Sequence, residues 1–494
     1  MNSKVKKFYI TTPIYYVNDR MHLGHAYTTI AADVLARYHR LKGEKVFFLT
    51  GTDEHGGKIE KAAEKLGKSP KQLCDDNVRR FKKGWEKLNI SYDNFIRTTD
   101  SYHEEAVKKA LEILHKKGLI YKGVYRGLYC LGCEQYKTES DLVNGKCPDH
   151  KKKPEIIEEE SYLFRLSKFG EEIRKKIKQD ELLIRPEDKK KEVLEFLKGG
   201  LKDISISRKK VKWGIPLPFA PHLTTYVWIE AFLNYLTGVG WEGNPKKLPE
   251  FWPADVHLMA KDIARVHATI WPAVLLGLEI ALPKQIFVHG YFTIEGQKMS
   301  KSLGNVIWPE ELIEKFGVDG TRYLLLSACC FGKDGDISWG KLKEKYNADL
   351  AKGIGNLVSR VITIGDTLGF KSEALKLRQV HSTEIGKQID AAWKNYERAL
   401  DEFKLDKALD SIWKLIAFCD QYIEKKRVWE ESKEQKICVL CLLYTISEIA
   451  KMLESFLPET SNKILCQLGL KSDEKKCVFA VKKTESLFPR LNSK

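Results

Sequence analysis

The stretch HLGHAYTTIAADVLARYHRL, residues 22–41, decides the fold of this chain because it predicts a helix whose first turn carries histidine and glycine. Its apolar residues recur at helical spacing from Ala26 onward, and the β-rich runs FYITTP (residues 8–13) and KVFFLT (residues 45–50) flank it. We therefore expect a β-α-β unit. Helical patterns in residues 76–88 and 103–117 continue the alternation, which predicts a parallel sheet covered by helices.

The start of this helix is a candidate anion site. A helix that begins at about Leu23 or Gly24 has unpaired backbone N–H groups in its first turn, at the positive end of the helix dipole. That end is a natural seat for a phosphate. His22 and His25 can project from the same side of the turn, and Gly24 would let an adenine or a phosphate approach the backbone. The alternative is an ordinary helix start with one surface and one packed histidine.

A second candidate is the segment GQKMSKSLGN, residues 296–305. Lys298 and Lys301 lie between Gly296 and Gly304, so the backbone can move while two ammonium groups close over a polyphosphate. Standing alone, the segment would favour a solvated basic loop instead. The sequence contains no GxxxxGK[ST] motif, and GVGWEG (residues 238–243) follows a helical pattern, so we predict a turn there.

Length and composition indicate a globular protein with several domains. A chain of 494 residues with 43% hydrophobic content is long enough for about two to four domains. The formal net charge of +17 favours an anionic partner such as nucleic acid, although a well-solvated surface could also carry it.

The same composition bears on the compartment. The N-terminus lacks an apolar signal region, and charged residues interrupt the longest apolar stretch, residues 437–457, so we expect neither secretion nor a membrane span. The 11 scattered cysteines fit a reducing compartment, and we expect a cytoplasmic protein.

One cysteine cluster has the spacing of a metal site. Cys130, Cys133, Cys147 and His150 form CxxC-x13-CxxH, which suits a closed tetrahedral Zn²⁺ site with a structural role. The alternative is four residues that never meet. Cys438 and Cys441 form another CxxC pair, but they lie in an apolar helical run, which favours buried packing.

The C-terminal part, beyond about residue 349, shows helical apolar spacing and predicts a helical bundle. Asn356 and Arg360 lie four residues apart on one helical face, and Trp429 follows another helix. An amide, a guanidinium and an indole can hydrogen-bond and stack with the unpaired bases of an RNA loop. On the residues alone, a structural role is favoured for Trp429.

These motifs together resemble a known family. HLGH followed by KMSKS resembles the paired signatures of class I aminoacyl-tRNA synthetases, and FFLTGTDEHG, YVWIEA, AKDIARVHA and VHGYFTIEGQKMSKSLGN are similar to methionyl-tRNA synthetases in particular. The resemblance covers nearly the whole chain and is strongest in residues 8–360. It implies an α/β fold: a Rossmann-type parallel-sheet catalytic domain with an inserted zinc-containing connective domain and a C-terminal α-helical bundle.

The resemblance also implies domain boundaries. The expected domains are the two halves of the Rossmann catalytic domain (1–120 and 224–293), the connective insertion with its zinc knuckle (121–223), the KMSKS stem-contact region (294–348) and the helical anticodon-binding domain (349–494).

The activity that the resemblance implies is ATP-dependent formation of methionyl-adenylate from L-methionine, followed by transfer to tRNA(Met), with Mg²⁺ bound to ATP. In such phosphoryl chemistry a protein contributes mainly alignment and charge neutralisation. The implied catalytic residues are His22, His25, Lys298, Lys301 and Arg208. The implied ATP-binding residues are His22, Gly24, His25, Asp262, Lys298 and Lys301.

Substrate selection should depend on an apolar slot, because aromatic faces suit a polarisable thioether. By resemblance, the slot is lined by Ile14, Tyr16, Trp228, Tyr235, Ile263 and His267, and Asp53 holds the substrate ammonium. Without the resemblance, the aromatic residues would be core and Asp53 a turn residue. By the same resemblance, Asn356, Arg360 and Trp429 read the CAU anticodon, and the zinc knuckle supports the path of the tRNA acceptor end.

The chain departs from the family pattern in four places. Ala260 stands where glycine is usual before Lys-Asp, and Glu230 replaces the aspartate of the VWxDA word; Asp420 and Val428 replace the usual asparagine and proline near Trp429. The sequence leaves room for no appended dimerising domain, so we expect a monomer. The competing hypotheses are a class I synthetase for leucine, isoleucine, valine or cysteine, and a zinc-containing tRNA-binding protein without catalysis.

Overall fold

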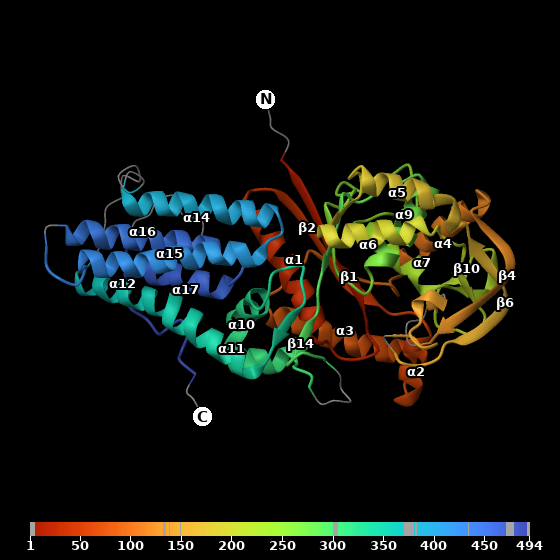
Figure 1. Ribbon diagram of the computed structural model, residues 1–494, viewed down its shortest axis with the longest axis horizontal. Helices are drawn as coiled ribbons and strands as arrows, with labels where there is room; N and C mark the ends of the chain where they lie inside the picture. Colours follow the sequence, from red (N-terminus) through yellow and green to blue (C-terminus); the bar gives the residue numbers. More distant parts are fainter. Residues whose placement is uncertain are drawn as a thin grey trace. The chain divides into compact units, whose positions relative to one another are not determined.

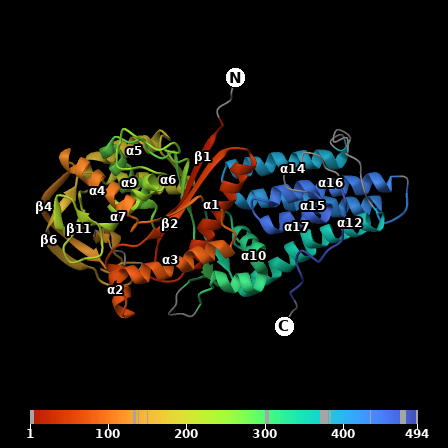
Figure 2. The same cartoon turned by 180° about the vertical axis from the view of Figure 1, so that it is seen from behind.

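The computed structural model describes residues 5–131, 135–137, 139–148, 150–299, 305–369, 380, 383–432, 434–470 and 479–491. They form two compact units (Figures 1 and 2). The first unit comprises residues 1–21, 43–85 and 91–289, and the second comprises residues 22–42, 86–90 and 290–494. The helix that follows the first strand, α1 (Leu23–Leu41), therefore belongs to the second unit.

A six-stranded sheet in the order β3-β2-β1-β12-β13-β7 forms the centre of the first unit. Neighbouring strands are parallel throughout, as predicted. Most residues of β1, β12 and β13 are buried, as expected for a parallel sheet covered on both faces. The strands are β1 (Lys7–Tyr16), β2 (Lys45–Asp53), β3 (Asn94–Arg97), β7 (Leu183–Arg185), β12 (Val256–Ala260) and β13 (Gln285–His289).

Helices cover this sheet where the sequence predicted helical segments. α3 and α4 include most of residues 76–88 and 103–117, and GVGWEG is a turn in which Gly240 and Gly243 have positive φ. Gly277 of α9 allows close packing, because a Cβ there would lie 2.8 Å from Leu114 Cδ2. The helices are α2 (Gly57–Lys65), α3 (Pro70–Lys87), α4 (Ser101–Lys116), α5 (Gly170–Lys178), α6 (Glu187–Lys198), α7 (Val227–Phe232), α8 (Asn234–Thr237) and α9 (Ala264–Leu278).

Two small antiparallel sheets occupy much of the segment 121–223 that we expect to be an insertion. The first, β5-β4-β6-β8, consists of β4 (Ile120–Cys130), β5 (Gln135–Lys137), β6 (Glu155–Phe164) and β8 (Ile204–Ser205). The second, β10-β11-β9, consists of β9 (Ser207–Arg208), β10 (Pro216–Leu217) and β11 (Ala220–Thr225). β7 also lies within 121–223 but pairs with β13 of the central sheet. The insertion therefore returns to the sheet part-way along, and the exact domain boundaries stay a prediction.

The second unit contains the predicted helical bundle. Figures 1 and 2 show α12, α14, α15 and α16 side by side, and the element contacts agree. The buried thiols of Cys438 and Cys441 lie in α16, as the packing hypothesis predicts. The helices after α1 are α10 (Pro309–Ser327), α11 (Trp339–Lys345), a π-helical segment (Tyr346–Ile354), α12 (Gly355–Thr367), α14 (Glu384–Asp401), α15 (Leu405–Lys426), α16 (Gln435–Leu453) and α17 (Pro458–Leu468).

A three-stranded sheet, β15-β14-β16, completes the second unit. Its strands are β14 (Phe292–Ile294), β15 (Gln297–Lys298) and β16 (Gly335–Ile337). Within the described part of the chain, none of the helices combines the length and the apolar character that crossing a bilayer requires.

Candidate active site and metal cluster

The first turn of α1 holds the HLGH histidines in a stacked pair. The helix begins at Leu23, as predicted, and the ring centroids of His22 and His25 are 3.5 Å apart. Each ring caps the backbone: His22 Nδ1 accepts from Gly24 N at 3.1 Å, and His25 Nδ1 accepts from His22 N at 3.3 Å. A Cβ at position 24 would lie 3.0 Å from His22 Cε1. Glycine therefore lets the first ring lie across the turn.

The environment of both rings favours the neutral form. Burial lowers the pKa of His22 to about 4, and burial together with His22 lowers the pKa of His25 well below its usual value. His22 is exposed to solvent, which weakens this effect of burial on its pKa. Because each Nδ1 accepts a backbone N–H, each ring carries its proton on Nε2. The pair can therefore offer Nε2–H donors to a phosphate oxygen.

The base of the lysine segment is anchored in the same unit. Lys298 ends β15, where it pairs with Thr293 of β14, and Lys301 lies outside the described residues. Asp336 fixes the turn between these strands: its Oδ1 accepts from Gly296 N at 2.7 Å and from Thr293 Oγ1 at 2.8 Å. Lys341, with these hydrogen bonds, lowers the pKa of Asp336 to about 2, so the anchor is ionised at neutral pH.

The residues predicted to line an amino-acid slot lie in the first unit and form two contacting groups. Tyr16 and Asp53 are neighbours across β1 and β2, and the rings of Trp228 and His267 pack edge to face at 6.3 Å. Ile14, Tyr16, Trp228 and Ile263 are half-buried against the apolar core. These positions can therefore form the walls of one slot.

His267 is held in a single tautomer. Its Nδ1 lies 2.8 Å from Ile263 O, which can only accept, so Nδ1 carries the proton. Its Nε2 then accepts from Tyr235 Oη at 2.8 Å. Burial lowers the pKa of His267 to about 4, so the imidazole is neutral. A neutral ring suits an apolar slot because it introduces no buried charge.

Arg208 and Asp262 occupy different environments. Arg208 is buried, and its Nη1 donates to Ser207 O at 2.8 Å and to Ser205 Oγ at 3.0 Å. Its guanidinium lies 4.0 Å from the ring centroid of Tyr226. Asp262 is exposed just before α9. Arg208 is thus rigidly held, whereas Asp262 is open to solvent.

Two features near the slot were not predicted. Glu230, noted only as a departure from the family word, is fully buried, and its Oε1 lies 3.1 Å from His55 Nδ1. His257 stacks on Tyr235 with ring centroids 4.1 Å apart and lies 2.8 Å from Thr11 Oγ1 through Nδ1. No periodicity links these positions, since the partners come from different elements.

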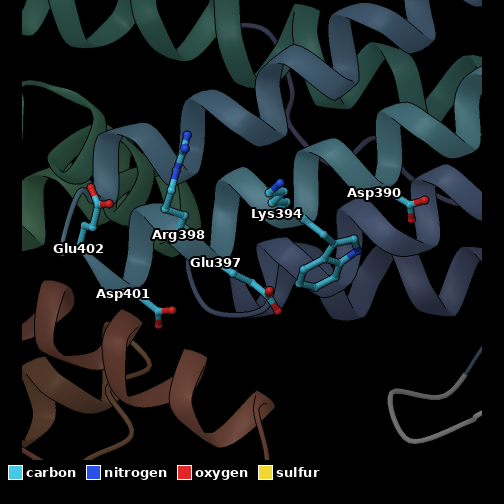
Figure 3. Close-up of a pocket in the computed structure, with 7 residues that line it drawn as sticks. Asp390, Lys394, Glu397, Arg398, Asp401 and Glu402 are labelled. Carbon is cyan, nitrogen blue, oxygen red and sulfur yellow. The ribbon is translucent and has the colours of Figure 1, made fainter.

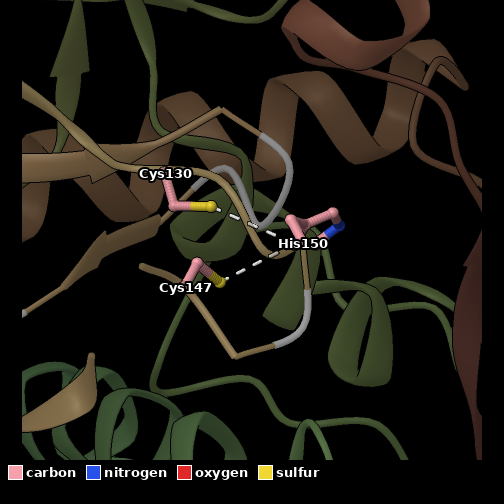
Figure 4. A group of neighbouring side chains, drawn as sticks. All are labelled: Cys130, Cys147 and His150. Carbon is pink, nitrogen blue, oxygen red and sulfur yellow. Dashed lines mark hydrogen bonds between the residues drawn. The ribbon is translucent and has the colours of Figure 1, made fainter. Parts of the chain in front are cut away.

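Three of the predicted metal ligands converge (Figure 4). His150 Nδ1 lies 4.0 Å from Cys130 Sγ and 3.8 Å from Cys147 Sγ, and all three ligand atoms lie within 4.8 Å of one another. No other such group occurs in the described part of the chain. Cys133 lies outside the described residues. Two thiolates and an imidazole at this separation fit the donor set and size of a zinc site.

The candidate base-reading residues lie in the bundle. Asn356 is exposed on α12, and Arg360 on the next turn donates through Nη2 to Glu424 Oε1 at 2.7 Å. Asp420 lies 3.7 Å from Arg360 Nη1; burial raises the pKa of Asp420 although Arg360 lowers it. The departure at 420 therefore places a second carboxylate beside the arginine.

Val428 shapes the turn that carries Trp429. Its backbone N donates to Ile423 O at 3.3 Å, a bond that proline could not make, and its side chain is buried. Trp429 is 47% exposed. The indole is therefore at the surface and not in the core, and its role in reading the anticodon stays a prediction.

A surface groove follows α14 in the same unit (Figure 3). Asp401 at its end accepts from Tyr38 Oη at 2.9 Å and from Lys42 Nζ at 3.2 Å. The groove is lined by Asp390, Trp393, Lys394, Glu397, Arg398, Asp401 and Glu402. None of the predicted site residues is among them.

Comparisons with known proteins give a consistent result. The family model "tRNA synthetases class I (M)" matches residues 8–153 and 138–362, and the model "Anticodon-binding domain of tRNA ligase" matches residues 383–488. The chain is 43% identical, over an alignment 510 positions long including gaps, to the Methionine--tRNA ligase of Caldanaerobacter subterraneus subsp. tengcongensis, covering 99% of this chain and 79% of the relative. The Methionine--tRNA ligase of Clostridium tetani is 42% identical with the same coverage.

The chain belongs to the class I methionyl-tRNA synthetases. A solved structure agrees: Mycobacterium tuberculosis methionyl-tRNA synthetase in complex with methionyl-adenylate matches with a TM-score of 0.91 and 34% identity, covering 98% of this chain and all of that one. Asn356 and Arg360 fall within the synthetase match, whereas Trp429 falls within the anticodon-binding match. The α/β sheet and helical bundle expected of a methionyl-tRNA synthetase are thereby confirmed.

Proposed function

We infer that the chain is a methionine--tRNA ligase, which activates L-methionine with ATP and transfers it from the adenylate to tRNA(Met). The observation that carries this inference is the 43% identity to a Methionine--tRNA ligase across 99% of the chain. The assembled slot supports it, because Tyr235 and the neutral His267 form an uncharged wall beside the half-buried Trp228.

ATP binding is assigned to His22, Gly24, His25, Lys298, Lys301 and Asp262. The Nε2–H groups of the stacked histidines donate to phosphate oxygens, and the first-turn N–H groups of α1 add the positive end of the helix dipole. Lys298 and Lys301 neutralise charge that spreads over the phosphates as pyrophosphate leaves. Mg²⁺ accompanies ATP, and Asp262 lies beside the ribose.

Methionine binding is assigned to Ile14, Tyr16, Asp53, Trp228, Tyr235, Ile263 and His267. The carboxylate of Asp53 pairs with the substrate ammonium, while the aromatic walls accept the thioether. The substrate carboxylate attacks the α-phosphate, and Arg208 stabilises the adenylate as it forms. Rigid positioning supplies most of the rate, because no general base is required for a carboxylate nucleophile.

Zinc binding is assigned to Cys130, Cys133, Cys147 and His150. Four protein ligands leave no open coordination position, so the metal would cross-link the loops that follow β4 and precede β6 rather than take part in catalysis. The three described ligands already lie within reach of one ion.

Anticodon recognition is assigned to Asn356, Arg360 and Trp429. The exposed indole can stack on an unpaired base, and the amide and guanidinium can hydrogen-bond to base edges. We further propose that the protein is cytoplasmic, because the buried thiols of Cys419, Cys438 and Cys441 suit a reducing compartment, and that it acts as a monomer. Analytical ultracentrifugation tests the monomer.

The direct test is charging of tRNA(Met) transcripts with radiolabelled methionine in the presence of ATP and Mg²⁺. We expect methionyl-tRNA from the wild-type chain, and charging reduced about 100-fold or more in Lys301→Gln, as when one transition-state donor is removed. A wild-type chain that binds tRNA(Met) but forms no methionyl-tRNA would refute the function.

A further inference from the structure

An ion pair joins the two elements that carry the proposed methionine slot. His55 follows Asp53 by two residues beyond the end of β2, and Glu230 follows Trp228 by two residues in α7. His55 Nδ1 and Glu230 Oε1 are 3.1 Å apart, and their side chains are 4% and 0% exposed. We propose that His55 and Glu230 are positioning residues that set the separation between Asp53 and Trp228, and so tune the affinity of the slot for methionine. This inference rests on the proposed function.

The loop that carries His55 is fixed on its other side. Trp213 Nε1 donates to Glu54 O at 2.5 Å, and Gly56 N donates to Trp213 O at 3.0 Å. The Trp213 ring also packs edge to face on His55, with ring centroids 5.6 Å apart. A shift of Glu230 would therefore move the imidazole and the adjoining loop together.

The charged groups around His55 favour one orientation of its ring, towards Glu230. Glu104 of α4 approaches His55 Nε2 at 3.7 Å, whereas the Glu54 carboxylate is taken up by Arg97 at 2.7 Å. The neighbouring His103 is neutral because burial, with His55 nearby, lowers its pKa to about 3. Glu230 supplies the closest opposite charge to His55, so a hydrogen-bonded ion pair with α7 is favoured over other orientations of the ring.

The length of the Glu230 side chain matters. The family word usually has aspartate here, and removing one methylene would withdraw the carboxylate by about 1.5 Å. Glu230 Oε2 is buried and has no partner within hydrogen-bond distance among the described residues. Burial raises the pKa of the Glu230 carboxyl, although His55 and the backbone N–H of Ile215 lower it. A buried carboxylate oxygen left unpaired is unfavourable for stability, so burial alone does not account for this residue. Trp228 Nε1, on the same helix, is likewise buried without a partner in the described part of the chain.

The test compares Glu230→Asp, which keeps the charge and shortens the side chain, with Glu230→Gln, which keeps the length and removes the charge. ATP–pyrophosphate exchange gives KM for methionine and KM for ATP separately. We expect Glu230→Asp to raise KM for methionine about tenfold, a typical coupling for residues in direct contact, while KM for ATP changes less than about twofold. His55→Gln should raise KM for methionine by a similar factor. The double variant Glu230→Asp, His55→Gln should raise this KM no further than either single variant does.

The control variant is Tyr396→Phe, which removes a buried hydrogen bond to Met452 O in the other unit. It should lower thermal stability without changing KM for methionine. If Glu230→Asp and His55→Gln lower only the thermal stability and leave KM for methionine at the wild-type value, the pair has a structural role alone and the inference is wrong. Failure of the proposed function is distinguishable, because the wild-type chain itself would then show no methionine-dependent exchange.

Discussion

Arg322 and Asp33 form an ion pair of 2.7 Å in which neither side chain has exposed surface. The arginine lies in α10 and the carboxylate in α1, so the pair fastens the histidine-bearing helix to α10 within the second unit. The guanidinium also donates to three backbone carbonyls at 2.7 to 3.2 Å, those of Leu88, Ser455 and Phe456. This one side chain thus joins α1, α10 and the turn between α16 and α17.

Replacing Arg322 with leucine should be strongly destabilising. Asp33 would lose the Arg322 guanidinium while keeping its pair with Arg37, and the three carbonyls would lose a donor. Breaking a buried ion pair in this way costs about 3 to 5 kcal/mol of unfolding free energy. Urea unfolding followed by circular dichroism measures the loss. The exposed pair Lys198–Glu195 provides the control, because Lys198→Met should change stability by less than about 1 kcal/mol. Equal losses of unfolding free energy in the two variants would show that the buried pair contributes no more to stability than the exposed one.

Replacing Tyr235 with phenylalanine should weaken methionine binding. The Tyr235 hydroxyl donates to His267 Nε2 at 2.8 Å, and without it a buried acceptor is unsatisfied and the ring loses its orientation. A cost of about 1 to 3 kcal/mol predicts a fall in kcat/KM for methionine of roughly 5- to 150-fold. The control Tyr121→Phe removes a hydroxyl that bonds Asp203 at 2.8 Å and should leave kcat/KM unchanged. An unaltered kcat/KM in Tyr235→Phe would show that the hydroxyl plays no part in the slot.

Acid should destabilise the protein through buried histidines. Burial lowers the pKa of His103 to about 3, of His267 to about 4, and of His257 well below its usual value. These side chains take up protons near pH 6.5 only when the chain unfolds. Their contribution to the unfolding free energy is therefore complete above that pH and is lost as the pH falls towards 4. Each adds a slope of about 1.4 kcal/mol per pH unit below pH 6.5.

Urea unfolding between pH 7.5 and 5 measures this slope, and His103→Gln should reduce it by about one proton. His55 acts in the opposite sense: burial lowers its pKa, but Glu230 and Glu104 outweigh burial and raise it. The contribution of His55 to the unfolding free energy is therefore complete at low pH, and it is lost as the pH rises through the pKa of His55 in the folded chain. An unchanged slope in His103→Gln would contradict the burial of this ring.

Removing the metal should loosen the β4–β6 region without unfolding the chain. We expect about one zinc per chain by elemental analysis, and its loss in Cys147→Ser, because a tetrahedral site needs all its ligands. Limited proteolysis should then cut within residues 131–154 first. Cys466→Ser, at an exposed thiol outside the cluster, should retain the metal. A zinc content that Cys147→Ser does not change would refute this ligand set.

Replacing Trp429 with alanine should affect tRNA and not amino-acid activation. The indole is half-exposed, and base stacking on such a ring is worth about 1 to 3 kcal/mol. KM for tRNA(Met) should rise while methionine-dependent exchange without tRNA stays at the wild-type rate. Tyr102→Ala, at another partly exposed aromatic ring in α4 of the first unit, is the matched control. If both variants behave alike, Trp429 does not read the anticodon.

The sequence predicted those features that depend on local patterns. The start of α1 at Leu23 follows from histidine and glycine before an apolar repeat, and the cluster of Cys130, Cys147 and His150 follows from their fixed spacing. The His55–Glu230 and Arg322–Asp33 pairs could not be predicted, because their partners lie far apart in the chain and meet only through packing. β7 could not be predicted either, because a three-residue strand has too few residues to show a periodic pattern.

Activation of methionine by this chain is measured by ATP–pyrophosphate exchange, compared across the apolar amino acids. With Mg²⁺ and equal concentrations of methionine, leucine, isoleucine, valine and cysteine, we expect kcat/KM for methionine to exceed the others by about 100-fold or more. Exchange that depends on one of the other amino acids, or no exchange by a folded protein that binds tRNA, would contradict the account.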